Sequence, residues 1–378
     1  MKKSDFLLIV GAAASILFLS VGTWIAPDVA FSANENRYLQ EAPEFSGESV
    51  LSGRFESQME TYLSDQIIGR EKWVSGKTLT EALAGVRDIN GVYLCAGGRV
   101  VERLTETQFN WSQYRKNLFQ IDQLREACRQ NQIPLDLLMV PTAACVYQED
   151  LPAHALVFDE EKAFEQAKEL LGDSLLDSRE TLRQNKERNV FFKTDHHWTG
   201  YGAFLAYKDY LERLGRDVSD LTYENTEPQV LTKEFKGTLY SKVLLDTLGI
   251  DTIETPKAGM TMDYQVRIGE KTYDSLYFEN WLDQKDKYAV YFGGNFDQVD
   301  ISVKNGEGTE KLLVIKDSFA NSFVPYLLND FREITMVDTR YYRGDISELA
   351  QDYDRVLVLY SISNLAEERL TLNQALLQ

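Results

Sequence analysis

A chain of 378 residues with 44% hydrophobic residues is long enough to bury a substantial core, which excludes a disordered tail or a pure linker. Its 59 acidic residues outnumber its 40 basic residues, so the formal net charge is −19. That charge repels phosphate backbones and anionic lipids, so neither nucleic acid nor an anionic lipid surface is expected as the main partner.

The longest uninterrupted apolar segment covers residues 6–26, and as a helix it matches the hydrocarbon thickness of a bilayer. Lysines precede this segment and Asp28 follows it, so the positive-inside rule places residues 1–5 in the cytoplasm. We therefore expect a transmembrane signal anchor at the cell membrane, with the rest of the chain extracytoplasmic. A cleaved signal peptide is the alternative, but the small-residue cleavage pattern before Ala33 is poor.

The segment after the anchor, residues 27–53, is rich in Glu, Ser, Asn and Gly, which is typical of an extended spacer. Residues 54–378 form the predicted main domain. Its first helix is expected at Phe55–Val74, where apolar residues recur at helical spacing. An amphipathic helix within residues 111–132 then leads into the apolar run Leu135–Val140, a predicted buried strand.

The alternation of helices and apolar runs continues towards the C-terminus. The expected helices are Lys162–Leu171 and Gly202–Leu214, and the expected strands are Val190–Phe192, Lys311–Ile315, Ile334–Val337 and Val356–Tyr360. This alternation indicates an α/β fold with a mainly parallel sheet that is covered on both faces. Residues 216–310 interrupt the pattern with short alternating segments, so we expect a β-rich insertion over one edge of the sheet.

The three cysteines Cys95, Cys128 and Cys145 have no metal-ligand spacing, and any disulfide scheme leaves one thiol over. Buried free thiols are the default expectation, and a Cys128–Cys145 bridge is the alternative.

Two of the three histidines are adjacent in the string KTDHHWT at residues 193–199, which follows an expected strand. On an extended segment alternate residues share a face, so Asp195 and His197 should lie together and His196 should face the other side. A carboxylate beside an imidazole fixes its tautomer and stabilises the imidazolium. This pair is therefore a candidate general base that acts on a hydroxyl group.

A second string, VIKDSFANS at residues 314–322, also follows an expected strand and precedes a short expected helix. Ser318 would then lie at a strand-to-helix turn, where its backbone N–H and the helix N-terminus could stabilise an oxyanion. The turn resembles a nucleophile elbow in its mechanics, although the Gly-x-Ser-x-Gly pattern is absent. A helix N-cap is the plainer interpretation of a serine at this position.

The strings TDHHWTGYGAF at residues 194–204 and KDSFANS at residues 316–322 resemble the DHHW protein family, which is related to the SGNH-hydrolase-like alginate O-acetylation proteins. Weaker matches are Glu35-Asn36-Arg37, the Asn90–Tyr93 turn, Gly293–Asn295 and Val337–Tyr342. The resemblance implies a three-layer α/β/α SGNH-hydrolase-like fold. It also implies an acyl-transfer triad of Asp195, His197 and Ser318.

In SGNH enzymes a glycine N–H and an asparagine side chain help to bind the oxyanion, and the resemblance makes Gly294 and Asn295 candidates for these roles. A hairpin turn explains this Gly-Gly-Asn sequence equally well, and Asn321 is an alternative donor. Core packing is the plainer interpretation for a tryptophan such as Trp198. The candidates for contacts with a glycan are Trp198, Arg340, Tyr341 and Tyr342.

The leading hypothesis is extracytoplasmic transfer of an acyl group, with acetyl expected, to hydroxyls of a cell-surface or exported polysaccharide through an acyl-enzyme on Ser318. Acyl donors such as acetyl-CoA lie inside the cell, and the resemblance implies a membrane-bound O-acyltransferase partner that passes the acyl group across the bilayer. One alternative is a carbohydrate esterase with the same triad. Another is a non-catalytic protein that binds glycan or acts as a scaffold.

No cofactor and no metal are expected. The run Asp195-His196-His197 could also be interpreted as a set of metal ligands, as in the DHH phosphoesterases. Adjacent histidines on an extended strand do not readily converge on one ion, and the further carboxylate motifs of a two-metal centre are not evident in the sequence.

Overall fold

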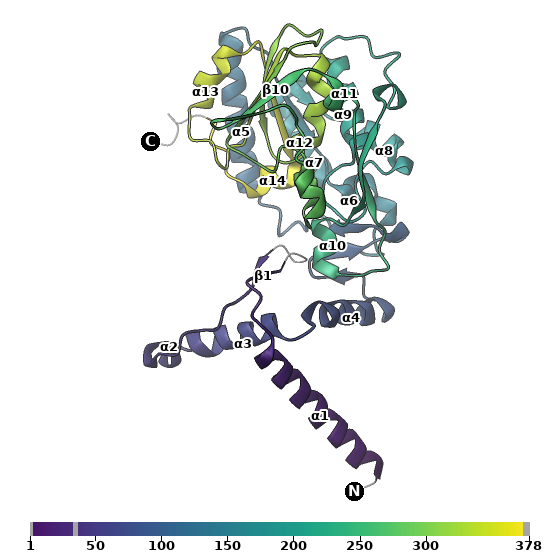
Figure 1. The fold of residues 1–378 in the computed structure, drawn as a ribbon. Helices are drawn as coiled ribbons and strands as arrows, with labels where there is room; N and C mark the ends of the chain where they lie inside the picture. The colour runs from purple at the N-terminus through teal and green to yellow at the C-terminus, as the bar shows by residue number, and fades with distance from the viewer. Residues whose placement is uncertain (1–2, 33–36, 373–378) are drawn as a thin grey trace. The chain divides into compact units, whose positions relative to one another are not determined.

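The computed structural model describes residues 3–32 and 37–372 of the chain (Figure 1). Lys2, Ala33, Glu35 and Asn36, which bear on the predicted topology, the cleavage pattern and the family resemblance, lie outside the described residues.

The chain folds into two compact units. The first unit comprises Met1–Asn90 and Tyr240–Asp246, and the second comprises Gly91–Leu239 and Thr247–Gln378. The candidate site lies wholly within the second unit.

The first unit begins with α1 (Lys3–Ile25), which overlaps the predicted anchor at residues 6–26. This helix is long and apolar enough to cross a membrane, a test that a signal sequence near the N-terminus also passes. Within the predicted spacer, β1 (Phe31–Ser32) pairs antiparallel with β2 (Arg37–Tyr38), and α2 (Gly47–Leu51) follows.

The prediction of one helix at Phe55–Val74 is wrong, because this segment forms parts of α3 (Arg54–Gln66) and α4 (Arg70–Leu83). Gly69 separates the two helices and has a φ of 70°. A residue in the left-handed region cannot continue a right-handed helix, so the periodic pattern is broken there. The unit also contains the short β3 (Asp88–Ile89).

The second unit contains most of the regular structure. Its helices are α5 (Trp111–Gln130), α6 (Ala143–Val146), α7 (Glu160–Leu171), α8 (Arg179–Gln184), α9 (Gly200–Arg213), α11 (Ala258–Thr261), α12 (Ala320–Phe323), α13 (Ile346–Leu349) and α14 (Ile362–Glu367), while α10 (Thr238–Val243) begins in this unit and ends in the first. Its strands are β4 (Val92–Leu94), β5 (Val100–Glu102), β6 (Leu135–Val140), β7 (Leu175–Leu176), β8 (Gln229–Phe235), β9 (Asp251–Thr255), β10 (Tyr264–Ile268), β11 (Lys271–Tyr273), β12 (Gln298–Val303), β13 (Lys311–Lys316), β14 (Glu333–Val337) and β15 (Arg355–Ser361).

The central sheet has eight strands in the order β11-β10-β12-β14-β13-β15-β6-β7. The strands from β14 to β7 pair in parallel, whereas β11, β10, β12 and β14 pair antiparallel. The sheet is therefore mixed, and the prediction of a mainly parallel sheet is wrong. The cause is the segment at residues 216–310, whose strands β10, β11 and β12 extend the sheet itself while β8 and β9 form a separate ladder.

Two hydrophobic clusters fill the two faces of the sheet. Along β13, Leu312 and Val314 face a cluster that includes residues of α9 and α12. Leu313 and Ile315 point the opposite way, into a cluster that includes residues of α5 and α7. This alternation is the period of two that a strand imposes, and it gives three layers, helix, sheet and helix. Figure 1 shows α5 and α13 on one side of the sheet and α9 and α11 on the other.

The cysteine thiols are free, with Cys128 and Cys145 buried, so the alternative of a bridge between them is wrong.

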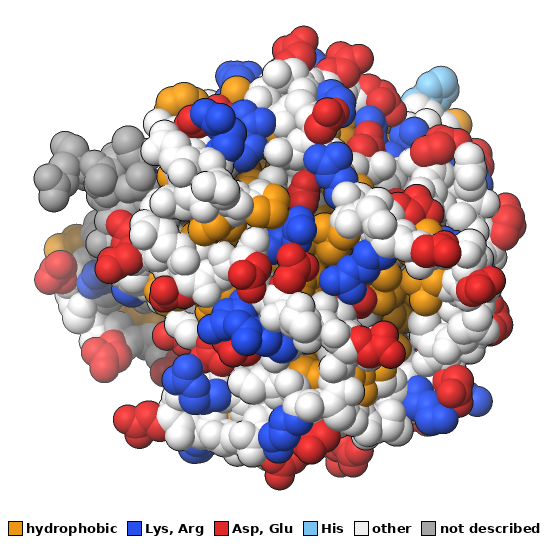
Figure 2. Space-filling model, turned by 90° about the horizontal axis from the view of Figure 1, so that it is seen from above, with side chains coloured by type: hydrophobic (Ala, Val, Ile, Leu, Met, Phe, Trp, Pro, Cys, Tyr) orange, Lys and Arg blue, Asp and Glu red, His pale blue; other side chains and the backbone are white. Residues whose placement is uncertain are grey.

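The net charge of −19 does not produce a single acidic field on the face drawn in Figure 2, where acidic and basic side chains are interspersed.

Candidate active site

The segment at residues 193–199 forms a tight loop, and the predicted strand Val190–Phe192 is wrong. Phe191 and Trp198 form only an isolated bridge. The loop closes on itself because the Phe192 N–H donates to the His197 carbonyl oxygen over 3.1 Å. Asp195 and His197 therefore meet through a turn, in which the His197 N–H donates to Asp195 Oδ1 over 3.0 Å, and not through the alternation of a strand.

A chain of short hydrogen bonds joins the three residues that the sequence singled out. His197 Nδ1 lies 2.6 Å from Asp195 Oδ1, and His197 Nε2 lies 2.7 Å from Ser318 Oγ. An ionised carboxylate can only accept, so Nδ1 carries the imidazole proton and Nε2 presents a lone pair to the serine hydroxyl. This is the arrangement in which an imidazole can take a proton from a hydroxyl nucleophile.

Ser318 lies in the turn between the end of β13 and the start of α12. The buried carboxylate of Asp317 holds this turn, since it accepts hydrogen bonds from the Phe319 and Ser361 N–H groups over 3.0 and 2.8 Å. It also accepts one from Asn364 Nδ2 over 2.8 Å. Among the described residues none accepts a hydrogen bond from the Ser318 backbone N–H, so this donor is available at the nucleophile.

Two aromatic residues support the turn and the imidazole. The Tyr288 ring stacks on His197 with 3.9 Å between centroids, and its hydroxyl lies 3.1 Å from the Ser318 carbonyl oxygen. Trp198 is fully buried, and its Nε1 donates to the Phe319 carbonyl oxygen over 3.0 Å. The prediction that Trp198 contacts a glycan is therefore wrong, because its ring lies in the core beneath the serine turn.

Asp195 is buried, and its second oxygen is held by Thr238, the first residue of α10. Asp195 Oδ2 accepts the Thr238 N–H over 2.7 Å and the Thr238 hydroxyl over 3.0 Å. Burial alone would raise the pKa of Asp195, but the imidazoles of His196 and His197 and the hydrogen bonds outweigh it, so the pKa is lowered. Asp195 is therefore ionised at neutral pH.

His197 is held in its neutral form. Burial and the neighbouring His196 lower its pKa to about 4 against the opposing effect of Asp195. An imidazole that is neutral at pH 7 has a free lone pair, which a general base requires.

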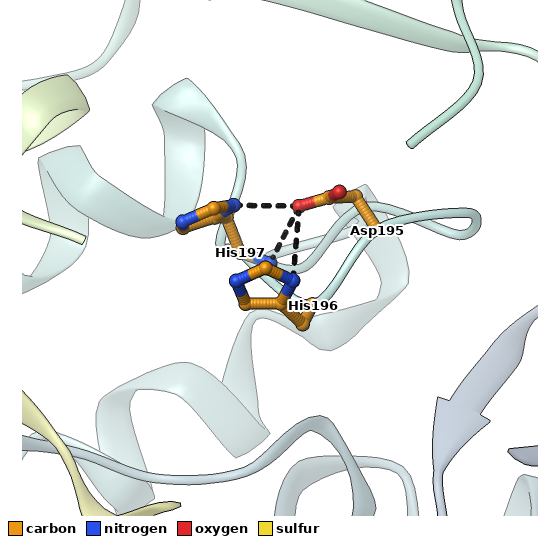
Figure 3. Close-up of side chains that lie close together, drawn as sticks. All are labelled: Asp195, His196 and His197. Atoms are coloured by element: carbon orange, nitrogen blue, oxygen red, sulfur yellow. Dashed lines mark hydrogen bonds and ion pairs between the residues drawn. The ribbon is translucent and has the colours of Figure 1, made fainter. Parts of the chain in front are cut away.

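His196 does not face away from the pair, so that prediction is wrong. Its ring centroid lies 3.9 Å from that of His197, and its Nδ1 lies 3.8 Å from Asp195 Oδ1. Figure 3 shows both imidazoles turned towards the same carboxylate. The reason is the turn, which removes the alternation of faces that an extended segment would have imposed.

The oxyanion candidates occupy a polar cluster around the buried ammonium of Lys316. Lys316 Nζ donates to Asn295 Oδ1 over 2.7 Å and to Asn321 Oδ1 over 2.9 Å. Burial lowers the pKa of Lys316 to about 8, although Asp338 opposes this. The Asn321 amide nitrogen gives one of its two hydrogens to Asn295 Oδ1 over 3.2 Å, and the Gly294 N–H donates to a carbonyl oxygen within its own turn. In the described part of the chain, neither hydrogen of Asn295 Nδ2 has a recorded acceptor, so of the three candidates this amide is the most available as a donor.

The remaining candidates follow β14. The Arg340 guanidinium pairs with Asp338 over 2.5 Å and with Glu368 over 3.2 Å, so its charge is already neutralised. Tyr342 packs against the hydrophobic core, whereas Tyr341 is half exposed. Of this group, Tyr341 has the most exposed aromatic ring, and the Arg340 guanidinium lies over that ring at 5.5 Å from its centroid.

Thr238 and Tyr288 were not predicted from the sequence, although Thr238 contacts Asp195 and Tyr288 contacts His197. Both lie within the β-rich insertion, far along the chain from residues 193–199 and 316–322. No motif marks them, and only the aromatic content of the insertion could have drawn attention to Tyr288.

One observation favours the interpretation of Asp195, His196 and His197 as metal ligands. One ligand atom from each residue lies within 4.8 Å of those of the other two. However, the Asp195 oxygens already accept hydrogen bonds from His197 and Thr238. A carboxylate surrounded by N–H and O–H donors is suited to hold an imidazole, and a cation would have to displace those donors.

The second unit is a three-layer α/β unit in which a serine, a histidine and an aspartate lie in hydrogen-bond contact beyond the carboxyl end of a central parallel strand, the arrangement typical of α/β hydrolase-like folds. Residues 174–337 match the family model described as DHHW protein, which confirms the resemblance seen in the sequence. The chain is 26% identical to the probable alginate O-acetylase AlgJ of Pseudomonas fluorescens over 238 residues, which are 59% of this chain and 55% of that protein. It thus spans about half the length of this curated relative.

Two solved structures share the fold. One is Bacillus cereus PatB1 with a sulfonyl adduct, with a TM-score of 0.61 and 21% identity over 73% of this chain and 98% of that chain. The other is a DHHW family protein from Eubacterium siraeum, with a TM-score of 0.59 and 20% identity over 74% of this chain and 93% of that chain.

The packing of Gly237 against Asp195 gives a test that leaves the three candidates intact. A Cβ at Gly237 would collide with the Cβ and carboxylate of Asp195, so we expect Gly237→Ala to shift the carboxylate away from His197. A misplacement of about 1 Å costs on the order of 100-fold in rate, so the reactivity of Ser318 towards an activated ester should fall by about 10- to 100-fold. Gly249→Ala is the control, because its Cβ would meet only the flexible Lys193 side chain at 3.7 Å. Equal reactivity of the two variants would contradict this account.

The low pKa of His197 gives a pH dependence. Below about pH 4 the imidazole is protonated and cannot accept the Ser318 proton, so the rate constant for acylation should rise through about pH 4 and then level off. The measurement is the pH profile of the pre-steady-state burst with an activated ester, with circular dichroism at each pH to verify folding. An inflection near the ordinary value of 6.5 would contradict the account of a buried, neutral imidazole.

Proposed function

We propose that this chain transfers an acyl group, with acetyl as the expected group, to hydroxyls of an extracytoplasmic polysaccharide through an acyl-enzyme on Ser318. The observation that carries the proposal is the pair of short hydrogen bonds, 2.7 Å and 2.6 Å, that links Ser318 to His197 and His197 to Asp195. Such a chain activates a hydroxyl as a nucleophile, and a hydroxyl nucleophile is what acyl transfer through a covalent intermediate needs.

In the first half-reaction, His197 Nε2 accepts the proton of Ser318 Oγ while Oγ attacks the carbonyl carbon of the acyl donor. The resulting oxyanion is bound by the Ser318 N–H and by Asn295 Nδ2. The tetrahedral intermediate collapses, the leaving group takes the proton from His197, and the acyl group remains on Ser318. Asp195 remains ionised throughout and stabilises the imidazolium.

In the second half-reaction, a sugar hydroxyl takes the place of the leaving group. His197 accepts its proton, its oxygen attacks the acyl carbonyl, and Ser318 is released with the proton returned from His197. Water in place of the sugar would make the same site an esterase. The similarity to a protein named as an alginate O-acetylase favours a sugar acceptor, and Tyr341 offers an exposed ring for stacking on it.

The proposed location is the extracytoplasmic face of the cell membrane, with α1 as a single-pass anchor. The length and composition of α1 support this proposal. A membrane-bound O-acyltransferase is the proposed partner, because cytoplasmic acyl donors cannot reach an extracytoplasmic serine unaided.

The test is intact-mass spectrometry of the full chain in lipid nanodiscs after reaction with an activated acetyl ester. We expect one acetyl adduct, mapped to Ser318, which Ser318→Ala abolishes, and a loss of ester turnover of at least about 1,000-fold in that variant. Ser302→Ala is the matched control, because Ser302 is an exposed serine of β12 in the same unit. Turnover that survives in folded Ser318→Ala would overturn the proposal, and turnover abolished by a chelator would favour a metal site.

The acceptor is then tested on the same acyl-enzyme. Alginate oligosaccharides are added, and the fraction of acetyl found on sugar is compared with the fraction released as acetate. Transfer in preference to hydrolysis supports a transferase, whereas release at the same rate with and without sugar points to an esterase.

A further inference from the structure

The hydroxyl of Thr238 connects the proposed triad to a second histidine. Thr238 Oγ1 lies 3.0 Å from Asp195 Oδ2 and 2.8 Å from His196 Nδ1. A hydroxyl has one proton, and an ionised carboxylate can only accept, so Thr238 gives its proton to Asp195. Towards His196 the same oxygen must therefore act as an acceptor.

This requirement fixes the proton on His196. Its Nδ1 must carry a hydrogen and donate it to Thr238 Oγ1, whether the ring is neutral or protonated. The hydrogen bonds then run from His196 through Thr238 to Asp195 Oδ2, while His197 donates to Oδ1 of the same carboxylate. Hydrogen bonds in a chain polarise one another, so the donor at the far end strengthens the bond that Thr238 makes to Asp195.

We propose that His196 is a positioning residue, which acts on Ser318 through Thr238, Asp195 and His197 by locking the Thr238 hydroxyl onto Asp195. This inference rests on the proposed function, because it assigns a role within the same site. His196 makes no recorded hydrogen bond to Ser318 in the described part of the chain, and its side chain is 36% exposed, so it acts through the carboxylate.

The hydrogen bonds from Thr238 hold the Asp195 carboxylate in its orientation. Its Oδ2 has two donors, both from Thr238, and loss of the hydroxyl leaves the backbone N–H alone on that oxygen. A buried charge with a missing hydrogen bond can rotate to recover a partner, which would lengthen its bond to His197. The effect should therefore appear in the rate of Ser318 acylation and not in the binding of the ester.

The test is a double-mutant cycle in the full chain, with the burst rate constant for Ser318 acylation as the readout. We expect Thr238→Val and His196→Gln each to lower this rate constant by about tenfold without changing the ester concentration for half-saturation. In the Thr238→Val background, His196→Gln should have no further effect, because the hydroxyl through which it acts is gone.

His196→Asn and Thr238→Ser are the matched controls. The Asn side chain places an N–H donor where Nδ1 lies, whereas Gln places its amide near the position of Nε2, so His196→Asn should stay within about threefold of wild type. Thr238→Ser keeps the hydroxyl and should do the same. Equal losses in His196→Asn and His196→Gln, or additive losses in the double variant, would overturn the inference.

An NMR measurement that does not depend on catalytic activity distinguishes this inference from the proposed function. The Nδ1 proton of His197 should give a downfield ¹H NMR resonance that Thr238→Val and His196→Gln move upfield and His196→Asn preserves. If Ser318 forms no acyl adduct but the resonance responds in this pattern, the proposed function fails and the hydrogen-bond chain stands. A resonance unchanged in all three variants would overturn the chain.

Discussion

The site depends on one buried negative charge, the carboxylate of Asp195. A charge removed from water is costly unless donors surround it, and here His197 and Thr238 supply those donors. The carboxylate fixes the tautomer of His197, and the tautomer decides that a lone pair faces Ser318. Gly237 packs so closely on Asp195 that a larger residue would displace it, so the backbone around this charge is constrained as well.

The fold brings the two halves of the site together from opposite parts of the chain. β13 lies between two parallel neighbours, β14 and β15. Ser318 follows its carboxyl end and so lies on the side of the sheet where ligands bind in α/β folds. The loop at residues 193–199 closes on its own backbone and presents His197 to that edge. The antiparallel strands of the insertion widen the sheet, and the same insertion contributes Tyr288, whose ring packs on the imidazole.

The sequence predicted the helices α5, α7 and α9 and the four parallel strands β6, β13, β14 and β15, because buried parallel strands form continuous apolar runs in the sequence. It also singled out Asp195, His197 and Ser318, which the structure brings into contact. It could not reveal that three strands of the insertion join the main sheet, since strand pairing depends on distant residues. Thr238 could not be predicted either, because its role comes from a contact with Asp195, which lies 43 residues earlier in the sequence. The orientation of His196 was mispredicted because a turn, and not a strand, sets it.

We propose that His197, held by Asp195, activates Ser318. The most direct test of this proposal is the second-order rate constant for modification of the full chain by methanesulfonyl fluoride, in wild type, His197→Gln and Asp195→Asn, with peptide mapping of the label. We expect a single sulfonyl group on Ser318 and a rate constant that falls by at least about 100-fold in both variants. Label on other serines, or equal rate constants in wild type and in folded His197→Gln, would contradict the account.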